Sequence, residues 1–535
     1  MECSYFALVL TVLALAFAYF LRKRREHFSL FERAGIEGPP PSVIWGNIWE
    51  IYTKSHKTCQ KEWHEKYGPV VGYFFGYQPT LLISDGEILK NVLFKDFHNF
   101  ADRGALMGRV DRNFGALTEL RGQRWKEVRS TLTPSFTSSK LKQLCPEVIH
   151  IVDDFMENVD AAHVNGKEFD MYELYKGLTL DTICRSALGV DFEIQKNIAE
   201  SRILHAIKAL FNSPMNYLTV ALACFHDIRR IGGSMVSRIF LRLGNKGRDP
   251  VNELLVRCEE VVKLRRSNPE NRRVDLLQLM IDAQGSESNA DISALIAGDD
   301  AERHQAQQEK GKTLGQCPIS KSKGLTDKEI TANAFLVLAA GYETTSSSLA
   351  FITRVLLRFP EVQERLREEL LEATNGGQVF EFEKLQKCRF MESFIQEVLR
   401  MYPPIHSFTS RYANEQKIYG DLTVPQGVDV LASTIALHYN EEVFPNPWEF
   451  QPTRFLPENK SVAMSWAWQP FGAGPRNCIG MRFAQMEIKI TLAKLLTKYR
   501  LSCDSEPKGD IQIPTMDRPA LQQIRDPLMV KTTFI

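Results

Sequence analysis

The residues best suited to chemistry lie in a glycine-rich segment near the C-terminal end of the chain, Phe471 to Gly480. Cys478 stands just ahead of a helical pattern, and the amides at the start of a helix favour an anionic sulfur. Arg476 supplies a cation that can pair with a carboxylate. The glycines let the backbone pass close to a large planar ligand. The segment indicates a ligand-binding thiolate; the alternative is a buried structural cysteine, which fits most lone cysteines.

A second group of polar residues, Gly341, Glu343, Thr344 and Thr345, interrupts a pattern that is otherwise apolar and helical. A carboxyl and hydroxyls inside a buried helix are costly unless they have partners. Hydrogen bonds to the carbonyl four residues back would satisfy the threonines without any function. By itself, this group fits a functional and a structural interpretation equally well.

The helix that carries this group has a clear start and a clear end. Thr326 and Glu329 have the spacing of a capping box. The apolar pattern continues to about Arg358, just before Pro360. This is ~30 residues, or ~45 Å at 1.5 Å per residue. Because it is apolar on most faces, we expect it to be buried and to cross a whole domain.

Composition excludes several function classes. The 535 residues include 66 Lys and Arg against 65 Asp and Glu, a net charge of +1. This balance gives no global case for nucleic-acid binding, which would need a basic domain. The ten cysteines are scattered singly without a C-x-x-C pair, which argues against zinc ribbons and thioredoxin-like sites. Free thiols in a reducing compartment are expected.

The N-terminal segment reads as a membrane anchor. Tyr5 to Leu21 is apolar and uncharged, and four basic residues follow at once. Seventeen residues are at the short end of a membrane span. Positive charge after the apolar run favours a retained anchor with a cytosolic chain over a cleaved signal peptide. The predicted organisation is an anchor over 1–25, a rigid proline-rich spacer over 26–42 and a single domain over 43–535. Residues 285–325 are polar and predicted to be an insertion in that domain.

The full pattern from Phe471 to Gly480 resembles the haem-binding loop of the cytochrome P450 family, F-x-x-G-x-R-x-C-x-G, at every fixed position. The resemblance implies a mainly α-helical fold with small β-sheets (α+β) and one haem b group, iron protoporphyrin IX. It implies that Cys478 is the thiolate ligand of the iron and that Arg476 contacts a propionate. Phe471, Gly472 and Gly480 would complete the cofactor-binding loop.

Other motifs appear in the order of the same family. Ala340 to Thr345 resembles its oxygen-binding segment, which implies that Thr344 and Glu343 serve proton delivery. Trp125 and Arg129 resemble its W-x-x-x-R helix, which binds a propionate. The remaining propionate contacts implied by the resemblance are Arg411 and Arg103.

The E-x-x-R pair of the family is matched by Glu397 and Arg400, which share a helix face at i, i+3. Phe450 to Phe455 resembles the following P-E-R-F element, with Thr453 in place of the usual acid. Arg454 can still close the network with Glu397, but one ionic contact is in doubt.

The resemblance implies a monooxygenase that inserts one oxygen atom of O2 into an apolar substrate such as a xenobiotic, a steroid or a fatty acid. Its partners would be an NADPH-dependent flavoprotein reductase, cytochrome b5 and membrane lipid, with no nucleic acid. The location would be the endoplasmic reticulum membrane, with a single span and a cytosolic catalytic domain. Two alternatives stay open: a thromboxane-synthase-like haem-thiolate isomerase of a lipid endoperoxide, against which Thr344 argues, and a non-catalytic haem binder.

Two surfaces are predicted as well. Residues 204–243 are rich in apolar side chains, and by resemblance they form a substrate entry that dips into the membrane; ordinary core helices are the alternative. A basic face for an acidic reductase, with plain solvated charge as its alternative, would comprise Lys126, Arg129, Lys140, Lys142 and Arg482.

Overall fold

The structure, a computed structural model, describes residues 2–104, 115–212, 224, 249–284 without 269, 271 and 274, 324–517, and 520–535. Its helices up to the chain centre are α1 Glu2–Phe28, α2 Leu30–Arg33, α3 Ile48–Lys54, α4 His56–Tyr67, α5 Gly86–Lys90, α6 Gly122–Leu132, α7 Ser138–Val164, α8 Met171–Thr182, α9 Arg202–Asn212, α12 Pro250–Ser267 and α13 Leu276–Asp282. The later helices are α16 Asp327–Arg358, α17 Pro360–Ala373, α18 Phe382–Leu385, α19 Arg389–Met401, α20 Thr434–His438, α21 Val462–Ala467 and α22 Met481–Lys498. Short 3-10 and π turns are η1 Asn91–Lys95, η2 Thr133–Phe136 and η3 Ile183–Ala187.

The strands form small sheets, so the predicted mainly helical fold is confirmed. The largest sheet has the order β1-β2-β7-β4, with β2 and β7 parallel and the other pairs antiparallel. Its strands are β1 Val70–Phe75, β2 Gln78–Ile83, β7 Asp429–Ala432 and β4 Ser410–Tyr412. The other strands are β3 Phe169–Asp170, β5 Lys417–Tyr419, β6 Leu422–Val424, β8 Tyr499–Ser502, β9 Thr515–Asp517, β10 Gln522–Ile524 and β11 Met529–Phe534.

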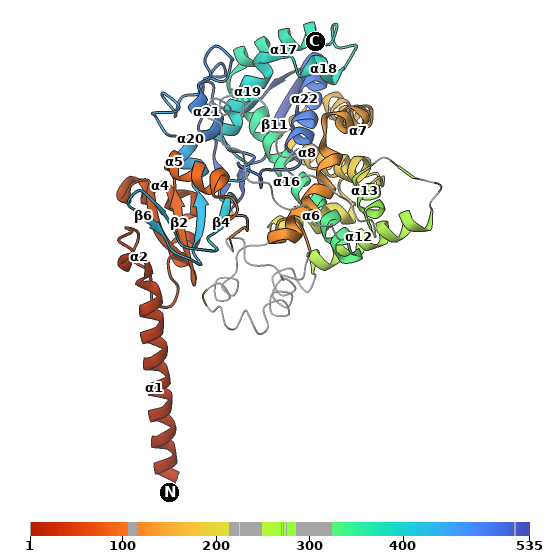
Figure 1. Cartoon of the computed structure of the whole chain (residues 1–535). Helices are drawn as coiled ribbons and strands as arrows, with labels where there is room; N and C mark the ends of the chain where they lie inside the picture. The colour runs from red at the N-terminus through yellow and green to blue at the C-terminus, as the bar shows by residue number, and fades with distance from the viewer. Residues whose placement is uncertain are drawn as a thin grey trace.

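The long helix α16 runs through the helical part of the molecule, with α8, α22 and α12 packed around it (Figure 1). Both hydrogen bonds of the predicted capping box are present at its start, between Thr326 and Glu329. The helix ends at Arg358, before Phe359 and Pro360, because the residue ahead of a proline avoids the helical region. Its burial and its bounds agree with the sequence-based expectation.

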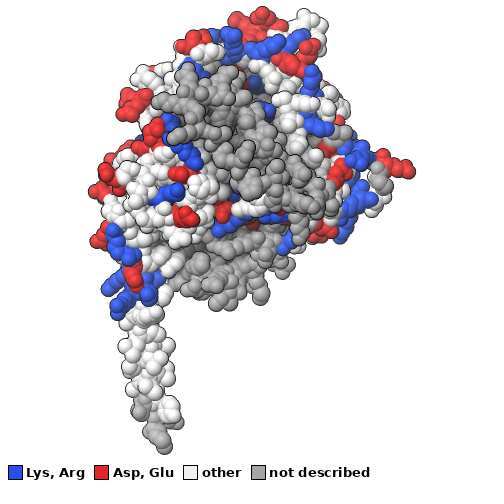
Figure 2. Space-filling view, in the orientation of Figure 1, with Lys and Arg blue, Asp and Glu red and all other residues white. Residues whose placement is uncertain are grey.

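Helix α1 stands away from the globular part and leaves its apolar side chains exposed (Figure 1). It is long and apolar enough to cross a membrane from Tyr5 onward. α16 is also long and apolar enough, but it is largely buried in the domain. Figure 2 shows basic side chains gathered where α1 meets the globular part. The exposed, uncharged length of α1 therefore fits the predicted anchor.

The segment expected to be a spacer is packed against the domain. Phe28 and Phe31 belong to a buried cluster that also contains Leu81 and Val430. The Gly72 amide of β1 donates to the Glu37 carbonyl at 2.8 Å, so the chain ahead of the prolines pairs with the sheet. The boundaries predicted at residues 25 and 42 are thus not boundaries of packing, because apolar side chains between them have a core to join.

The end of the predicted stop-transfer segment also differs from expectation. Arg24 is buried while Arg22, Lys23 and Arg25 are exposed. Its guanidinium donates to the carbonyls of Val43, Ile44 and Cys224. A basic segment that lay wholly in solvent would leave Arg24 exposed. Helix α1 instead already contacts the domain at Arg24.

Most of the predicted insertion, residues 285–323, lies outside the described residues. The residues on either side of this segment lie close together, since the Leu325 amide donates to the Ala283 carbonyl at 3.3 Å. Leu325 itself is buried in the main core, so it belongs to the domain and not to the insertion. Neighbouring ends are what an insertion into a compact domain requires.

Candidate haem-thiolate site

Cys478 sits in a tight loop between α21 and α22. Its amide donates to the Phe471 carbonyl at 2.8 Å, and the Asn477 amide donates to the Gly474 carbonyl at 2.9 Å. Gly474 has a positive φ of 73°, and a Cβ there would lie 2.3 Å from the Leu93 carbonyl oxygen. Only glycine fits this turn, because any side chain would meet the backbone of η1. The loop geometry therefore explains the fixed glycine of the motif.

The Cys478 side chain differs from the other cysteines that the structure describes. Seven of these are buried, and Cys478 alone is exposed. Burial of the surrounding loop nevertheless raises the pKa of its thiol, and a hydrogen bond from the Gly480 amide together with the Arg129 and Arg103 charges lowers it. An exposed sulfur lodged in dense protein faces an internal space, where a metal ion would complete the stabilisation of the thiolate.

Three arginines, the buried Arg411 and Arg476 and the half-buried Arg103, form a cluster beside this loop, here called the arginine cluster. Arg476 donates to the carbonyls of Ala101 and Leu120, at 2.8 Å each. Arg411 donates to the Ala473 carbonyl at 2.9 Å, and Arg103 donates to the Arg476 carbonyl at 3.0 Å. These bonds join the cluster to the Cys478 loop and hold three cations close to one another beside it.

The arginine cluster lacks a matching anion among the described residues. Burial first, and then the neighbouring arginines, lower the pKa of Arg476 to about 8. Burial and the Arg129 charge lower the pKa of Arg103 to about 10, and burial and the Arg103 charge lower that of Arg411 well below its usual value. Among the described residues, the acid paired with this cluster is Asp102, 3.8 Å from Arg476, and the buried Nε of Arg411 has no hydrogen-bond partner. A ligand with two carboxylates, such as haem, fits this donor set.

Trp125 and Arg129 come to the same loop from α6. The guanidinium of Arg476 lies 4.0 Å from the Trp125 ring centroid, a cation–π contact. Arg129 donates to the Asn477 carbonyl at 3.1 Å and to its side-chain oxygen at 2.9 Å. The structure therefore places Arg129 against Asn477, the residue next to Cys478. There it fixes the loop, and its positive charge favours the thiolate form of Cys478.

Helix α16 brings Ala340, Glu343 and Thr344 to the centre of the molecule. Ala340 is exposed although most of the helix beyond it is buried. The Thr344 hydroxyl donates to the Ala340 carbonyl at 2.7 Å, the bond that a purely structural threonine would make. A Cβ on Gly341 would lie 2.4 Å from Ile183 Cδ1, so that glycine serves the close contact with η3. An exposed alanine at mid-helix marks an internal space on this side as well.

Glu343 is buried, and its carboxylate is held by three donors. The Tyr172 hydroxyl of α8 donates to Oε1 at 2.7 Å, and the Ser347 hydroxyl donates at 3.1 Å. Gln523 of β10 donates to the same oxygen through its side-chain amide. Tyr172 and Gln523 carry no local sequence signal for this contact, because they lie 171 and 180 residues away from Glu343 in the chain.

Glu397 forms the predicted network with both arginines, here called the Glu397 network. Arg400 donates to its two oxygens at 2.7 and 2.9 Å, and Arg454 donates at 3.2 Å. Arg454 also donates to the carbonyls of Pro445, Asn446 and Glu449. Its guanidinium therefore forms hydrogen bonds even though Thr453 stands where the family has an acid. The pair is fully buried and bidentate, which makes it a strong structural tie.

His438 connects this network to the Cys478 loop and was not identified from the sequence. Its Nδ1 lies 2.8 Å from the Arg400 carbonyl, and its Nε2 accepts a 2.8 Å hydrogen bond from the Gln469 amide. Nδ1 therefore donates and the ring is neutral. Burial lowers the pKa of His438 to about 3. Gln469 lies two residues before Phe471, so the Glu397 network helps to fix the start of the loop.

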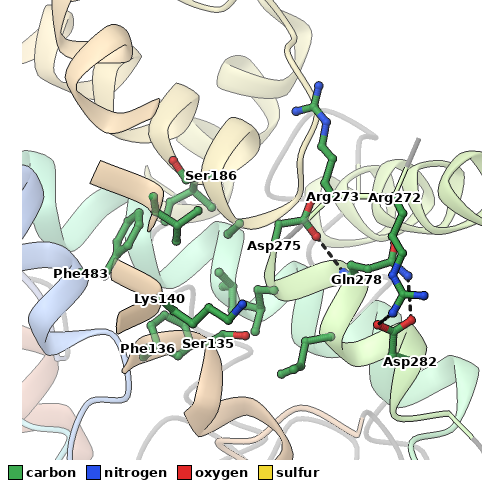
Figure 3. A pocket seen from close by; sticks show the side chains of 16 residues that line it. Ser135, Phe136, Lys140, Ser186, Arg272, Arg273, Asp275, Gln278, Asp282 and Phe483 are labelled. Atoms are coloured by element: carbon green, nitrogen blue, oxygen red, sulfur yellow. Dashed lines mark hydrogen bonds and ion pairs between the residues drawn. The ribbon is translucent and has the colours of Figure 1, made fainter. Parts of the chain in front are cut away.

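Several residues of the predicted basic face make contacts within the domain. Lys142 is ion-paired with Glu383 at 2.6 Å, Arg482 donates to the Ser138 hydroxyl, and Arg129 is bound to Asn477. Lys140 reaches a separate pocket of about 240 Å³ between α7, α13 and α22, while Arg272 at its edge pairs with Asp282 (Figure 3). No predicted haem-contacting residue lines this pocket.

The predicted substrate entry lies mostly outside the described residues, which include α9 and Cys224 from this stretch. In α9, Leu204 and Ile207 are buried, and the Phe211 ring lies 5.9 Å from that of Tyr342 in α16. This part of the stretch is therefore packed against the central helix.

Comparison with known proteins agrees with this geometry. Rabbit (Oryctolagus cuniculus) cytochrome P450 3A6 is 30% identical over 502 residues, which cover 94% of this chain and 92% of the relative. Thromboxane-A synthase of Rattus norvegicus is 32% identical over 493 residues, 91% of this chain and 90% of the relative. The family model described as cytochrome P450 matches residues 36–531. The chain belongs to the cytochrome P450 family, as the Cys478 loop indicated.

Proposed function

We propose that this protein is a membrane-anchored haem-thiolate monooxygenase that inserts one oxygen atom of O2 into an apolar small organic substrate. Electrons come from NADPH through a flavoprotein reductase. The observation that carries this proposal is the exposed Cys478 sulfur, set in the family loop beside the three cations of the arginine cluster. When bound, haem would supply the oxygen chemistry, because its thiolate ligand donates electron density that favours O–O cleavage.

The residues of the chain have separate tasks in this proposal. Cys478 binds the iron, and Arg103, Arg411 and Arg476 neutralise the propionates. Phe471, Gly472 and Gly480 shape the loop, with Trp125 and Arg129 behind it. Ala340, a small residue exposed in the middle of α16, would leave room for the haem. Thr344 holds the proton-donating water, and Glu343 supplies protons to it as a general acid.

The thiolate assignment is tested by spectroscopy. The reduced, CO-bound protein is expected to absorb at the long-wavelength Soret position of thiolate ligation. Cys478→Ser should lose the haem or that band. Cys503→Ser, which changes a buried cysteine, is the matched control. A Cys478→Ser protein that keeps the band would contradict the assignment.

The reaction is tested by reconstitution with reductase, NADPH and a panel of apolar substrates. Oxygenated product that depends on NADPH and O2 is expected, and Thr344→Ala should lower the product formed per O2 consumed. The thromboxane-A synthase relative makes a haem-thiolate isomerase the second candidate. That function would show as turnover of an endoperoxide without NADPH and no NADPH-dependent product. Absence of any turnover would favour a non-catalytic haem binder.

The location follows from α1 and its basic end. We propose one span in the endoplasmic reticulum membrane, with the catalytic domain in the cytosol beside the reductase and cytochrome b5. The sequon Asn459-Lys460-Ser461 provides a topology test, because Asn459 is exposed. It should stay unglycosylated in microsomes, and a glycan on Asn459 would place the domain in the lumen.

A further inference from the structure

The buried carboxylate of Glu343 is held asymmetrically. The hydroxyls of Tyr172 and Ser347 and the amide of Gln523 all donate to Oε1. In the described part of the chain, no hydrogen bond reaches Oε2. A carboxylate that only had to be tolerated in the core would use both oxygens, since each can accept two hydrogen bonds. The arrangement therefore holds one oxygen in place and leaves the other for a further partner.

The three donors are positioned by three separate elements. Tyr172 is near the start of α8, where the Asp170 side chain caps its amide at 3.0 Å. The Lys176 ammonium lies 4.0 Å from its ring centroid. Burial and the Glu343 charge raise the pKa of Tyr172 well above its usual value, so its hydroxyl keeps the proton that it donates. Ser347 is one turn from Glu343 on α16, and Gln523 lies on β10.

The side chain of Gln523 satisfies only one of its two polar groups. Its Nε2 donates to Glu343, while its own Oε1 is buried and accepts no hydrogen bond from a described residue. The reversed amide would set that oxygen against the carboxylate, which is repulsive, so the orientation is determined. An unpaired buried carbonyl is unfavourable. The Gln523 side chain lies here although its oxygen is unpaired, which indicates that the contact with Glu343 decides its position.

We infer that Tyr172 and Gln523 are positioning residues that fix the Glu343 carboxylate so that Oε2 transfers protons toward Thr344. This inference rests on the proposed monooxygenase function. Glu343 and Thr344 are consecutive on α16 and so are turned by about 100° from each other. Rotation of the carboxylate would change the position of Oε2, and three bonds to Oε1 oppose that rotation.

The chain offers a matched control on the same two helices. Tyr175 lies three residues after Tyr172 on α8, and its buried hydroxyl bonds to Thr353 of α16 at 2.7 Å. Tyr175→Phe therefore removes a buried tyrosine hydroxyl between α8 and α16 without touching Glu343. Tyr172→Phe and Gln523→Met remove the donors to Glu343 with little change in volume.

The first measurement compares two routes to product. With NADPH, reductase and O2, we expect the product formed per O2 consumed to fall about three- to tenfold in Tyr172→Phe and in Gln523→Met. With iodosylbenzene, which transfers its oxygen atom to substrate and leaves as iodobenzene without added protons, turnover should stay within about twofold. Tyr175→Phe should match the wild type on both routes. Equal losses of product on both routes would show that Tyr172 and Gln523 have a structural role only.

The second measurement does not depend on turnover. The C–O stretch of the reduced CO complex is recorded at one fixed pH, because its frequency and width report the charges and dipoles around the bound CO. A Glu343 carboxylate that loses a donor to Oε1 is freer to turn, so the band should shift or broaden in Tyr172→Phe and in Gln523→Met. Tyr175→Phe should keep the wild-type band, because its hydroxyl bonds to Thr353 and not to Glu343. An unchanged band in Tyr172→Phe and Gln523→Met, or the same change in Tyr175→Phe, would overturn the inference.

The two measurements separate the inference from the function on which it rests. If the wild type forms no product by either route while the C–O band changes in Tyr172→Phe and Gln523→Met, the monooxygenase proposal fails and the positioning of Glu343 stands. If product forms normally in Tyr172→Phe and Gln523→Met, the positioning role fails and the function stands.

Discussion

Two groups of arginines lie near the Cys478 loop, and they differ in their contacts with acids. In the Glu397 network, one carboxylate lies in direct contact with both Arg400 and Arg454. In the arginine cluster, Arg476 has Asp102 at 3.8 Å, and Arg103 and Arg411 form no ion pair with a described residue. Every arginine of the first group therefore contacts a carboxylate, whereas the second group has room for an anion from a ligand. Buried charge that pairs internally indicates structure, whereas buried charge without a partner indicates a ligand.

The largest effect is expected when the internal pairing is broken. Glu397→Gln leaves Arg400 and Arg454 as buried cations without a counter-charge. We expect the free energy of unfolding to fall by about 3–5 kcal/mol, measured by urea denaturation with circular dichroism. The control is Glu381→Gln, which removes a pair with Lys384 that is half exposed and should change stability by less than about 1 kcal/mol. Equal effects of the two changes would remove the distinction drawn above.

Arg411→Gln tests the other group. We expect haem retention to weaken by about 1.5–3 kcal/mol, because a charge-assisted hydrogen bond to a carboxylate is lost. Haem transfer to a scavenging apoprotein measures this loss. The protein without haem should lose little stability, since three like charges repel one another. A haem-free protein as unstable as Glu397→Gln would show that Arg411 is a structural residue.

His438, which joins the Glu397 network to the Cys478 loop, should contribute to the pH dependence of stability. The pKa of His438 is about 3 in the folded protein, against an ordinary value of 6.5. Between these values the unfolded chain binds the extra proton, so its stabilising contribution is complete above pH 6.5 and falls toward pH 3. The expected slope from this residue is about 1.4 kcal/mol per pH unit. His438→Gln should remove it from a series of unfolding curves, and an unchanged slope would contradict the assignment.

The smallest effect is expected for Thr453→Glu, which restores the acid that the family carries at this position. Arg454 already contacts Glu397 and three carbonyls. The added carboxylate should therefore change the free energy of unfolding by less than about 1 kcal/mol. A gain of several kcal/mol would show that the Glu397 network is short of negative charge, and the contrast with the arginine cluster would narrow.

Much of the site was predictable because its signals are local. The loop from Phe471 to Gly480 combines a cysteine, an arginine and the glycines of its turns within ten residues. The capping box at Thr326 and the end of α16 at Arg358 depend on nearby residues, and both agree with the structure. The anchor followed from an uninterrupted apolar run.

Other features could not be read locally. His438 meets Arg400 across 38 residues, and Gln523 meets Glu343 across 180. Phe28 and Phe31 join a core with Val430, so the expected spacer is packed. Such contacts depend on which surfaces the fold brings together, and a single sequence carries no local signal for them.

The sequence by itself determined the family, the thiolate candidate and the length of the central helix, because each depends on residues within one turn or one periodic pattern. Only the tertiary structure decided which arginines have partners, which cysteine faces an internal space and which oxygen of Glu343 is held. Those properties depend on burial and on contacts between distant segments, and charge becomes decisive only where water is excluded.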